Sequence, residues 1–181
     1  MSFRIALFLS LLAGCGLPPA EVVGGGPVAP LATGVPVPSA LAGQLQTAGL
    51  DLHALPSLDT LTPKQLHTVM ESFTKALGVS CTGCHVQNDF AAATPRKNVA
   101  RRMWTDILGR LQLADGAPLY CDSCHQGNTT FLDRSDGAAL QAWMQTAFVD
   151  GLKRKDGQAQ ACGTCHGTPF VPGFLSTWET G

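Results

Sequence analysis

The chain has 181 residues, of which 45% are hydrophobic and 14% are charged, and its formal net charge is −1. This length accommodates one domain of ordinary size with additional segments. Charges of both signs are mixed along the sequence, and no basic segment reaches the length typical of nucleic-acid binding. The composition therefore gives no indication of a nucleic-acid partner.

The N-terminus has the pattern of an export signal. Arg4 precedes an apolar run over residues 5–12 that is too short to span a bilayer. The run leads into Leu12-Ala13-Gly14-Cys15, which resembles the bacterial lipobox, in which the cysteine is lipidated and begins the mature protein. We predict a lipoprotein signal peptide at residues 1–14 and lipidation at Cys15. An ordinary signal peptide followed by an unmodified cysteine is the alternative.

The next segment has the composition of a linker. Residues 16–48 are dominated by Gly, Pro, Ala and Val and show neither helical nor strand periodicity. A packed N-terminal strand is the weaker interpretation, because proline recurs too often. We predict a lipidated tether at 15–48 and a single domain at 49–181.

Three segments of that domain carry apolar residues at helical spacing. They cover residues 62–78, 94–111 and 135–152, and the first opens with Thr62, a proline and Gln65, a helix-start pattern. No segment alternates with a period of two for long enough to indicate a sheet. The predicted fold class is all-α, built of repeated units of helix, turn and cysteine motif, with little or no sheet.

Three copies of the motif Cys-x-x-Cys-His follow the predicted helices. They consist of Cys81, Cys84 and His85, then Cys121, Cys124 and His125, and finally Cys162, Cys165 and His166. Met103 and Met144 each precede their motif by 18 residues. A fixed interval of this kind indicates one supersecondary unit used repeatedly.

The motif is the attachment signature for c-type haem. The two thiols add to the haem vinyl groups, and the adjoining histidine lies beneath the ring and ligates the iron. Zinc is the main competitor, but a tetrahedral site uses four thiols and leaves the third motif unexplained. A thioredoxin-like redox motif needs a βαβ context that is absent. The sequence therefore predicts three covalently bound haems, with no cysteine left over for a disulfide.

The second axial ligand of each iron is a separate question. Met70, Met103 and Met144 each lie on the apolar stripe of a predicted helix upstream of one motif. Taken singly, each is interpreted as core packing, but three methionines for three haems favour thioether ligation. His53 and His67 are the remaining histidines, and His67 borders the face of Met70 and is the rival ligand there. Histidine/methionine ligation raises the reduction potential relative to bis-histidine ligation.

Arg96, Lys97, Arg101 and Arg102 make the start of the second helix basic. We interpret this run as a solvated helix face. Pairing with haem propionates is the alternative.

Several segments resemble the bound cytochrome subunit of photosynthetic reaction centres. They are Leu55-Pro56, Leu61–Leu66, Val69-Met70, Phe73, Ala76–Val79, Cys81–His85, Lys97–Met103 and Cys121–Gly127. The resemblance implies that a helix carrying a distal methionine precedes each of three haem motifs. That family is typically tetrahaem, with a distal histidine at its fourth haem, whereas this chain is shorter and has three motifs.

These observations predict a lipid-anchored trihaem cytochrome that transfers electrons between redox protein partners and transforms no small-molecule substrate. If all three irons are six-coordinate, no iron has an open position at which a substrate could bind. A multihaem enzyme of the peroxidase or nitrogen-oxide reductase type is the alternative and requires an open haem position. A dedicated reaction-centre donor is a third possibility. The expected location is periplasmic or cell-surface, on either the inner or the outer membrane.

Overall fold

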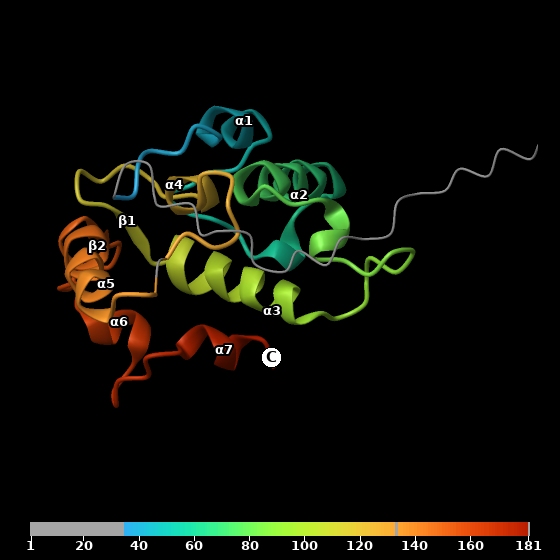
Figure 1. Cartoon of the computed structure of the whole chain (residues 1–181). Helices are drawn as coiled ribbons and strands as arrows, with labels where there is room; N and C mark the ends of the chain where they lie inside the picture. The colour runs from blue at the N-terminus through green and yellow to red at the C-terminus, as the bar shows by residue number, and fades with distance from the viewer. Residues whose placement is uncertain (1–34, 133, 181) are drawn as a thin grey trace, which may run out of the picture.

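The computed structural model describes residues 35–132 and 134–180, and these form a mostly helical domain (Figure 1). The helices are α1 (Ala42–Thr47), α2 (Pro63–Leu77), α3 (Pro95–Arg102), α4 (Cys121–His125), α5 (Gly137–Met144), α6 (Cys162–His166) and α7 (Phe174–Trp178). Short 3-10 turns η1 (Leu58–Thr60) and η2 (Cys81–Gly83) and two π-helical segments, η3 (Met103–Leu108) and η4 (Gln145–Asp150), complete the helical part. Strands β1 (Leu111–Leu113) and β2 (Leu152–Arg154) pair antiparallel. The predicted all-α class, with little sheet, is confirmed. The predicted signal peptide and Cys15 lie outside the described residues.

Helix α2 begins and ends where its sequence predicts. The Thr62 hydroxyl accepts from the Gln65 amide at 3.3 Å, and the Gln65 side chain accepts from the Thr62 amide at 3.1 Å. Gly78 ends the helix with a φ of 64°. A Cβ atom at Gly78 would lie 2.0 Å from the Gly127 carbonyl oxygen, so only glycine fits where α2 meets the end of α4.

The second and third predicted helices each change type halfway along. The α-helical geometry of α3 gives way to η3 at Met103, and that of α5 gives way to η4 directly after Met144. Each π segment is followed by a glycine: a Cβ at Gly109 would lie 2.5 Å from the Thr105 carbonyl, and one at Gly151 would meet the Ala147 carbonyl at 2.6 Å. Single π turns occur preferentially at functional sites.

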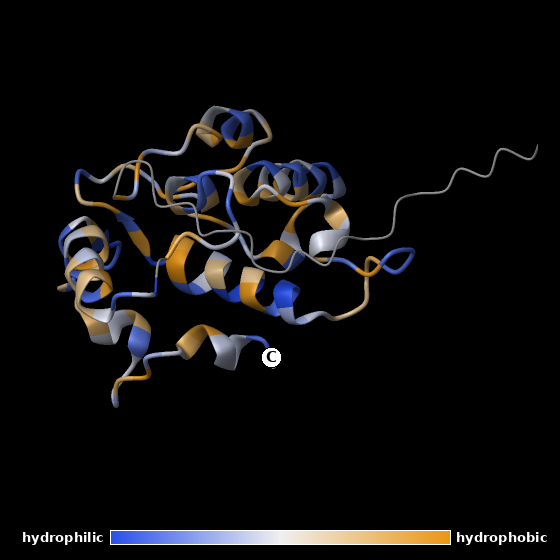
Figure 2. Cartoon of the chain, in the orientation of Figure 1, coloured by the Kyte–Doolittle hydropathy of each residue, from blue (hydrophilic) through white to orange (hydrophobic). Residues whose placement is uncertain are grey.

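The core lies between α2, η3 and the start of α4. Trp104 is 2% exposed, and its ring contacts Phe73 and Tyr120 at centroid distances of 6.0 and 6.2 Å. The Trp104 Nε1 atom donates to the Pro56 carbonyl at 2.8 Å. Along α3 and η3 apolar residues alternate with hydrophilic ones, as expected for a helix with one buried face (Figure 2).

The N-terminal part of the described chain packs on the domain. Leu45 of α1 is fully buried, and the Val37 amide donates to the Ser123 carbonyl at 3.0 Å. The prediction of a tether that extends to residue 48 is therefore wrong at that end. Residues 35–48 belong to the folded domain, because Leu45 is buried in the core and the Asp122 carboxylate of the second motif binds residues 39–41.

The sheet joins the second and third repeats symmetrically. Gln112 pairs with Lys153, and each lies nine residues before the first cysteine of its motif. An antiparallel pairing centred on equivalent residues relates the two strands by a local two-fold axis. The sequence repeat is thus also a structural repeat across β1 and β2.

Candidate haem-binding motifs

The first motif begins with η2 and is bonded to the start of α3. The Thr94 hydroxyl caps α3 and donates to the Cys84 carbonyl at 2.7 Å, and Arg96 donates to the Gly83 carbonyl at 2.7 Å. These bonds tie the motif to the helix that carries Met103. A cavity of about 330 Å³ opens beside the motif, lined by residues 82–85, residues 94–96 and Glu179.

The second motif forms α4 and is the most enclosed of the three. The Ser123 side chain is fully buried and accepts from the Tyr120 amide at 3.1 Å, which fixes the entry into the helix. Asp122 accepts hydrogen bonds from the Ser39 hydroxyl at 2.7 Å and from the Ala40 amide at 2.8 Å. The N-terminal segment is thereby bound to the haem motif itself.

The third motif forms α6. The Thr164 hydroxyl accepts from the Ala161 amide at 3.2 Å, the counterpart of the Ser123 contact in the second motif. Cys165 packs against the main core, whereas Cys162 is exposed. Helix α7 follows and packs on α3, and Trp178 stacks under the Arg102 guanidinium at 5.3 Å.

All three motif histidines make the same kind of hydrogen bond. The Nδ1 atom of His85 lies 3.1 Å from the Phe90 carbonyl oxygen. In the second motif, the Nδ1 atom of His125 lies 2.9 Å from the Asn128 carbonyl oxygen, and in the third, the Nδ1 atom of His166 lies 2.9 Å from the Val171 carbonyl oxygen. A carbonyl oxygen only accepts, so Nδ1 must carry the proton. Each ring therefore keeps the lone pair of Nε2 for a metal, as metal-ligating histidines do.

The surroundings of four motif cysteines disfavour thiol redox chemistry. All six in the described residues are free thiols. Burial raises the pKa of Cys84, Cys121 and Cys165, and it raises the pKa of Cys124 to about 12. A reactive CxxC motif needs a lowered thiol pKa, so the donor set does not fit a thioredoxin-like site.

A zinc centre does not fit the arrangement either. Within residues 35–132 and 134–180, no three His, Cys, Asp or Glu side chains converge as metal ligands. A structural zinc ion needs four such ligands at one point. Separate motifs, each with two thiols and one histidine, fit one covalently held haem apiece.

Two of the three predicted methionine ligands occupy matching positions. Met103 and Met144 are both half-buried, at the points where α3 and α5 change to π geometry. Met70 is half-buried on α2, against the core. Both rival histidines lie on the surface: His53 is exposed, and the His67 side chain is 76% exposed with its Nδ1 atom 3.7 Å from Glu71.

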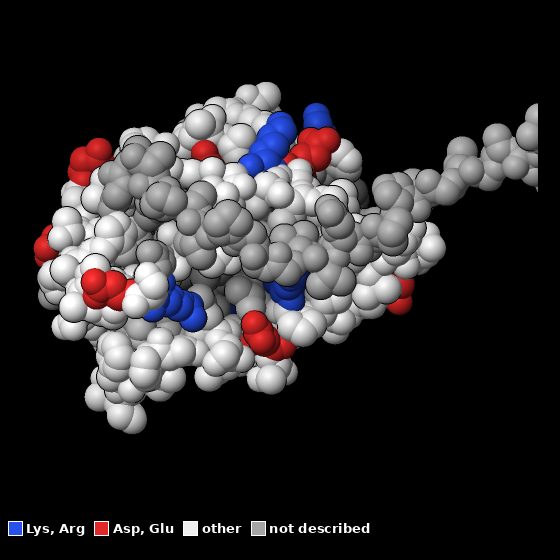
Figure 3. Space-filling view, in the orientation of Figure 1, with Lys and Arg blue, Asp and Glu red and all other residues white. Residues whose placement is uncertain are grey.

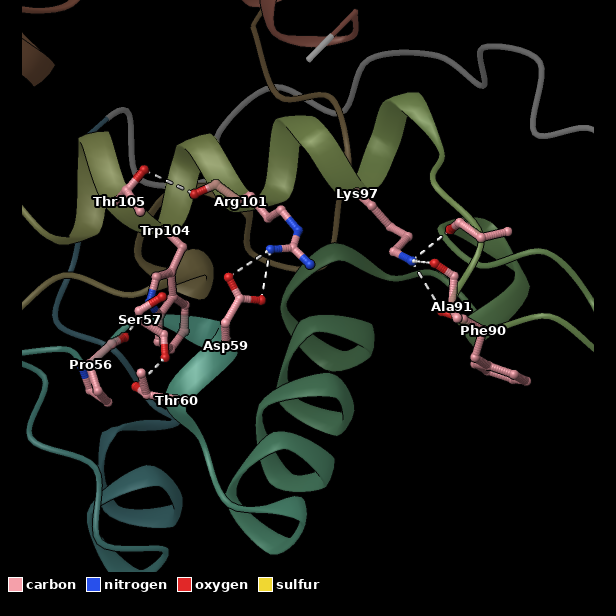
Figure 4. A network of polar contacts seen from close by, with 11 residues as sticks. Pro56, Ser57, Asp59, Thr60, Phe90, Ala91, Lys97, Arg101, Trp104 and Thr105 are labelled. Atoms are coloured by element: carbon pink, nitrogen blue, oxygen red, sulfur yellow. Dashed lines mark hydrogen bonds and ion pairs between the residues drawn. The ribbon is translucent and has the colours of Figure 1, made fainter.

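The basic residues near α3 each have a partner in the polypeptide. Arg101 pairs with Asp59 at 2.9 Å, and Lys97 donates to three backbone carbonyls (Figure 4). Arg102 contacts Asp106 at 2.9 Å. Elsewhere on the face shown in Figure 3, charges of both signs occur in small mixed groups. Pairing with haem propionates stays a prediction.

The residues that hold the motifs in place are not evident from the sequence. Asp122 stands inside the second motif, but its partners lie some 80 residues earlier in the chain. Thr94 was recognisable as a helix cap, yet its bond to the first motif was not. A local pattern exists only at the third residue of the second and third motifs, where Ser123 and Thr164 each accept a hydrogen bond from the amide three residues earlier.

Comparison with known families agrees with this geometry. A family model described as cytochrome c7 and related cytochrome c matches residues 67–167, which is 101 of the 181 residues. The chain belongs to this family. It is a multihaem c-type cytochrome with covalently bound haem, a class that functions in electron transfer. Searches of curated proteins and of solved structures found no match. The specific resemblance to the reaction-centre subunit stays a prediction.

Proposed function

We propose that this cytochrome binds three haems, one at each motif, and relays electrons without transforming a substrate. The observation that carries the proposal is the shared histidine geometry, in which three Nδ1 atoms donate to backbone carbonyls and leave three Nε2 atoms for iron. His85, His125 and His166 are the proximal ligands, and Met70, Met103 and Met144 are the distal ones. The haems, when bound, supply one-electron redox chemistry.

The polypeptide attaches, orients and shields these groups. The cysteine pairs fix each haem by two bonds, and the carbonyl partner of each histidine sets the direction of its Nε2 atom. Methionine as the second ligand raises the reduction potential and closes the last iron position. A closed position excludes substrate, which favours electron transfer over an enzyme of the peroxidase or nitrogen-oxide reductase type.

Helix α3 and its extension η3 connect the three sites. Thr94 and Arg96 at its start contact the first motif, and Met103 lies in its middle. Near its end, the charge of Asp106 adds to the larger effect of burial in raising the pKa of Cys165 in the third motif. From Pro95 to Leu108 this element spans about 20 Å at the rise of a helix. We infer a haem order of first, second and third along it.

We further propose that the protein is exported and attached to a membrane through lipid on Cys15. The pattern at residues 12–15 supports this proposal. In the described part of the chain, no helix is long and apolar enough to cross a membrane. Its partners would then be redox proteins at the periplasm or cell surface, and a reaction centre is one candidate acceptor of its electrons.

The test uses Met103→Leu and Met144→Leu in the full-length holoprotein. Leucine nearly conserves volume, so a methionine that only packs would tolerate it. If both are ligands, each variant loses about one third of the sulfur-to-iron absorption band, the double variant loses about two thirds, and carbon monoxide binds at the opened irons.

Intact mass measured on the same preparations gives the number of haems and the lipid on Cys15 independently. A full band in Met144→Leu, without carbon monoxide binding, would show that Met144 only packs. Carbon monoxide binding to the unmodified protein would favour the enzyme instead.

A further inference from the structure

The carbonyl group that orients His85 is shared with a lysine. The Phe90 oxygen accepts from His85 Nδ1 at 3.1 Å and from Lys97 Nζ at 3.1 Å. Lys97 also donates to the Ala91 carbonyl at 3.1 Å and to the Ala92 carbonyl at 2.6 Å (Figure 4). An ammonium group has three donors, and all three are used on this one loop. The loop after the first motif is therefore folded around the Lys97 charge.

Lys97 is itself fixed relative to the first motif. Its backbone amide donates to the Thr94 hydroxyl at 3.3 Å, and the same hydroxyl donates to the Cys84 carbonyl at 2.7 Å. Cys84 directly precedes His85. Lys97 is thus linked to the segment around His85 in two ways. Its backbone amide is linked through Thr94 to Cys84, and its ammonium group binds the loop that begins at Phe90.

We propose that Lys97 is a positioning residue for His85 and that its charge raises the reduction potential of the haem bound there. The inference rests on the proposed haem at the first motif. A cation on the Phe90 oxygen withdraws electron density from that acceptor, so the bond from Nδ1–H weakens and the imidazole donates less to iron. A nearby positive charge also favours the reduced, less positive iron.

The third motif provides a natural contrast. His166 uses the Val171 carbonyl, also five residues further along the chain, as its acceptor. No lysine or arginine follows Lys155 in the sequence, so the loop after His166 carries no cation of its own. The lysine-bound carbonyl is therefore not required for the histidine bond to form. The bond from Lys97 is an additional contact at the first motif, which points to a role in setting the reduction potential rather than in attaching the haem.

The experiment compares Lys97→Met and Lys97→Arg with Arg101→Met in the intact holoprotein. Arg101 is one turn further along the helix and pairs with Asp59 instead of the loop. Optical redox titration should show one potential lowered in Lys97→Met and the other two unchanged, while Lys97→Arg retains most of the native value. Nuclear magnetic resonance of the reduced protein should show the His85 Nδ1 proton exchanging at least tenfold faster in Lys97→Met, because the loop that Lys97 holds through three carbonyls then opens more often.

Equal shifts in Lys97→Met and Arg101→Met would overturn the proposal, because any nearby charge would then suffice. Unchanged potentials and exchange in Lys97→Met would overturn it as well. If Lys97→Met does not mature, Lys97→Gln replaces it, since the amide keeps a donor without the charge, and it must still lower that potential. A haem count below three in the unmodified protein would instead contradict the proposed function, so the two failures are distinguishable.

Discussion

The second and third repeats share their local structure but not their surroundings. In each, an α-helix changes to π geometry, a glycine ends it, a short strand follows, and an Asp-Gly turn leads to the motif. Asp115 accepts from the amide two residues on at 2.8 Å, and Asp156 does so at 3.1 Å. Their glycines, Gly116 and Gly157, both have positive φ. Local sequence is therefore sufficient to specify this unit twice.

The difference lies in the large residues that enclose the second repeat. Trp104 is replaced at the equivalent third-repeat position by the exposed Gln145, and the buried Tyr120 is replaced by the exposed Ala161. Helix α2 packs on α4, whereas α6 lies at the edge of the molecule beside α7 (Figure 1). The repeat thus specifies the motif, and a few substitutions decide whether it is internal or peripheral. Under the proposed function, the haem at the second motif would be the most enclosed of the three.

The largest expected effect comes from removing the residue that encloses the second repeat. Trp104→Ala should lower the free energy of unfolding by about 3–5 kcal/mol, because it leaves a cavity between Phe73 and Tyr120 and an unpaired Pro56 carbonyl. The matched variant Gln145→Ala should change it by less than about 0.5 kcal/mol. Urea unfolding followed by far-ultraviolet circular dichroism measures both. Similar losses in the two variants would contradict the distinction between the repeats.

A smaller effect is expected at Asp122, the second residue of the second motif. Asp122→Ala should cost about 1–2 kcal/mol, because the Ser39 hydroxyl and the Ala40 and Leu41 amides lose their acceptor. Hydrogen exchange at those two amides should accelerate, while exchange in α2 stays slow. The equivalent residue in the third motif is Gly163, where a Cβ would meet only Thr168 Oγ1, at 3.7 Å.

Gly163→Ala is therefore the control for Asp122→Ala, and it should leave both stability and exchange unchanged. Slow amide exchange at residues 40 and 41 in Asp122→Ala would mean that α1 and the core alone hold the N-terminal segment. The contact between the segment and the haem motif would then be incidental.

How far the sequence predicts this molecule depends on the range of the interactions. The cap pairing Thr62 with Gln65 involves neighbours three residues apart, and it formed as predicted. The all-α class and the repeat also follow from short-range patterns. The π geometry of η3 and η4 was not predicted, because apolar spacing alone does not distinguish it from an α-helix.

Long-range contacts account for what was missed. The bond between Ser39 and Asp122 joins residues 83 positions apart, and proline-rich composition in the N-terminal segment gave no sign of it. The histidine acceptors depend on loop conformations such as that of Gln126, which has a φ of 47°. At the candidate site, the motif residues were recognisable from the sequence. Lys97 was interpreted as part of a solvated helix face, but it binds three carbonyls of the loop after the first motif.

The smallest expected effect concerns the only tyrosine in the sequence. Ser72 Oγ donates to the Val69 carbonyl at 2.7 Å, so the Tyr120 hydroxyl must donate to Ser72, at 2.6 Å. Burial raises the pKa of Tyr120 well above its ordinary value. Tyr120→Phe should cost about 1 kcal/mol at neutral pH through the lost hydrogen bond. Its third-repeat counterpart, Ala161, has no such group.

The same bond predicts a pH dependence whose sign follows from proton binding. Below about pH 10 the phenol is protonated in the folded and unfolded states, so the raised pKa of folded Tyr120 does not change the free energy of unfolding. Above that pH the unfolded chain releases the proton while folded Tyr120 retains it, so stability falls by about 1.4 kcal/mol per pH unit. The unfolding free energies of the unmodified protein and Tyr120→Phe should therefore converge near pH 11. A constant difference between pH 8 and 11 would mean that Tyr120 ionises in the folded state, and that the interior of the second repeat admits water.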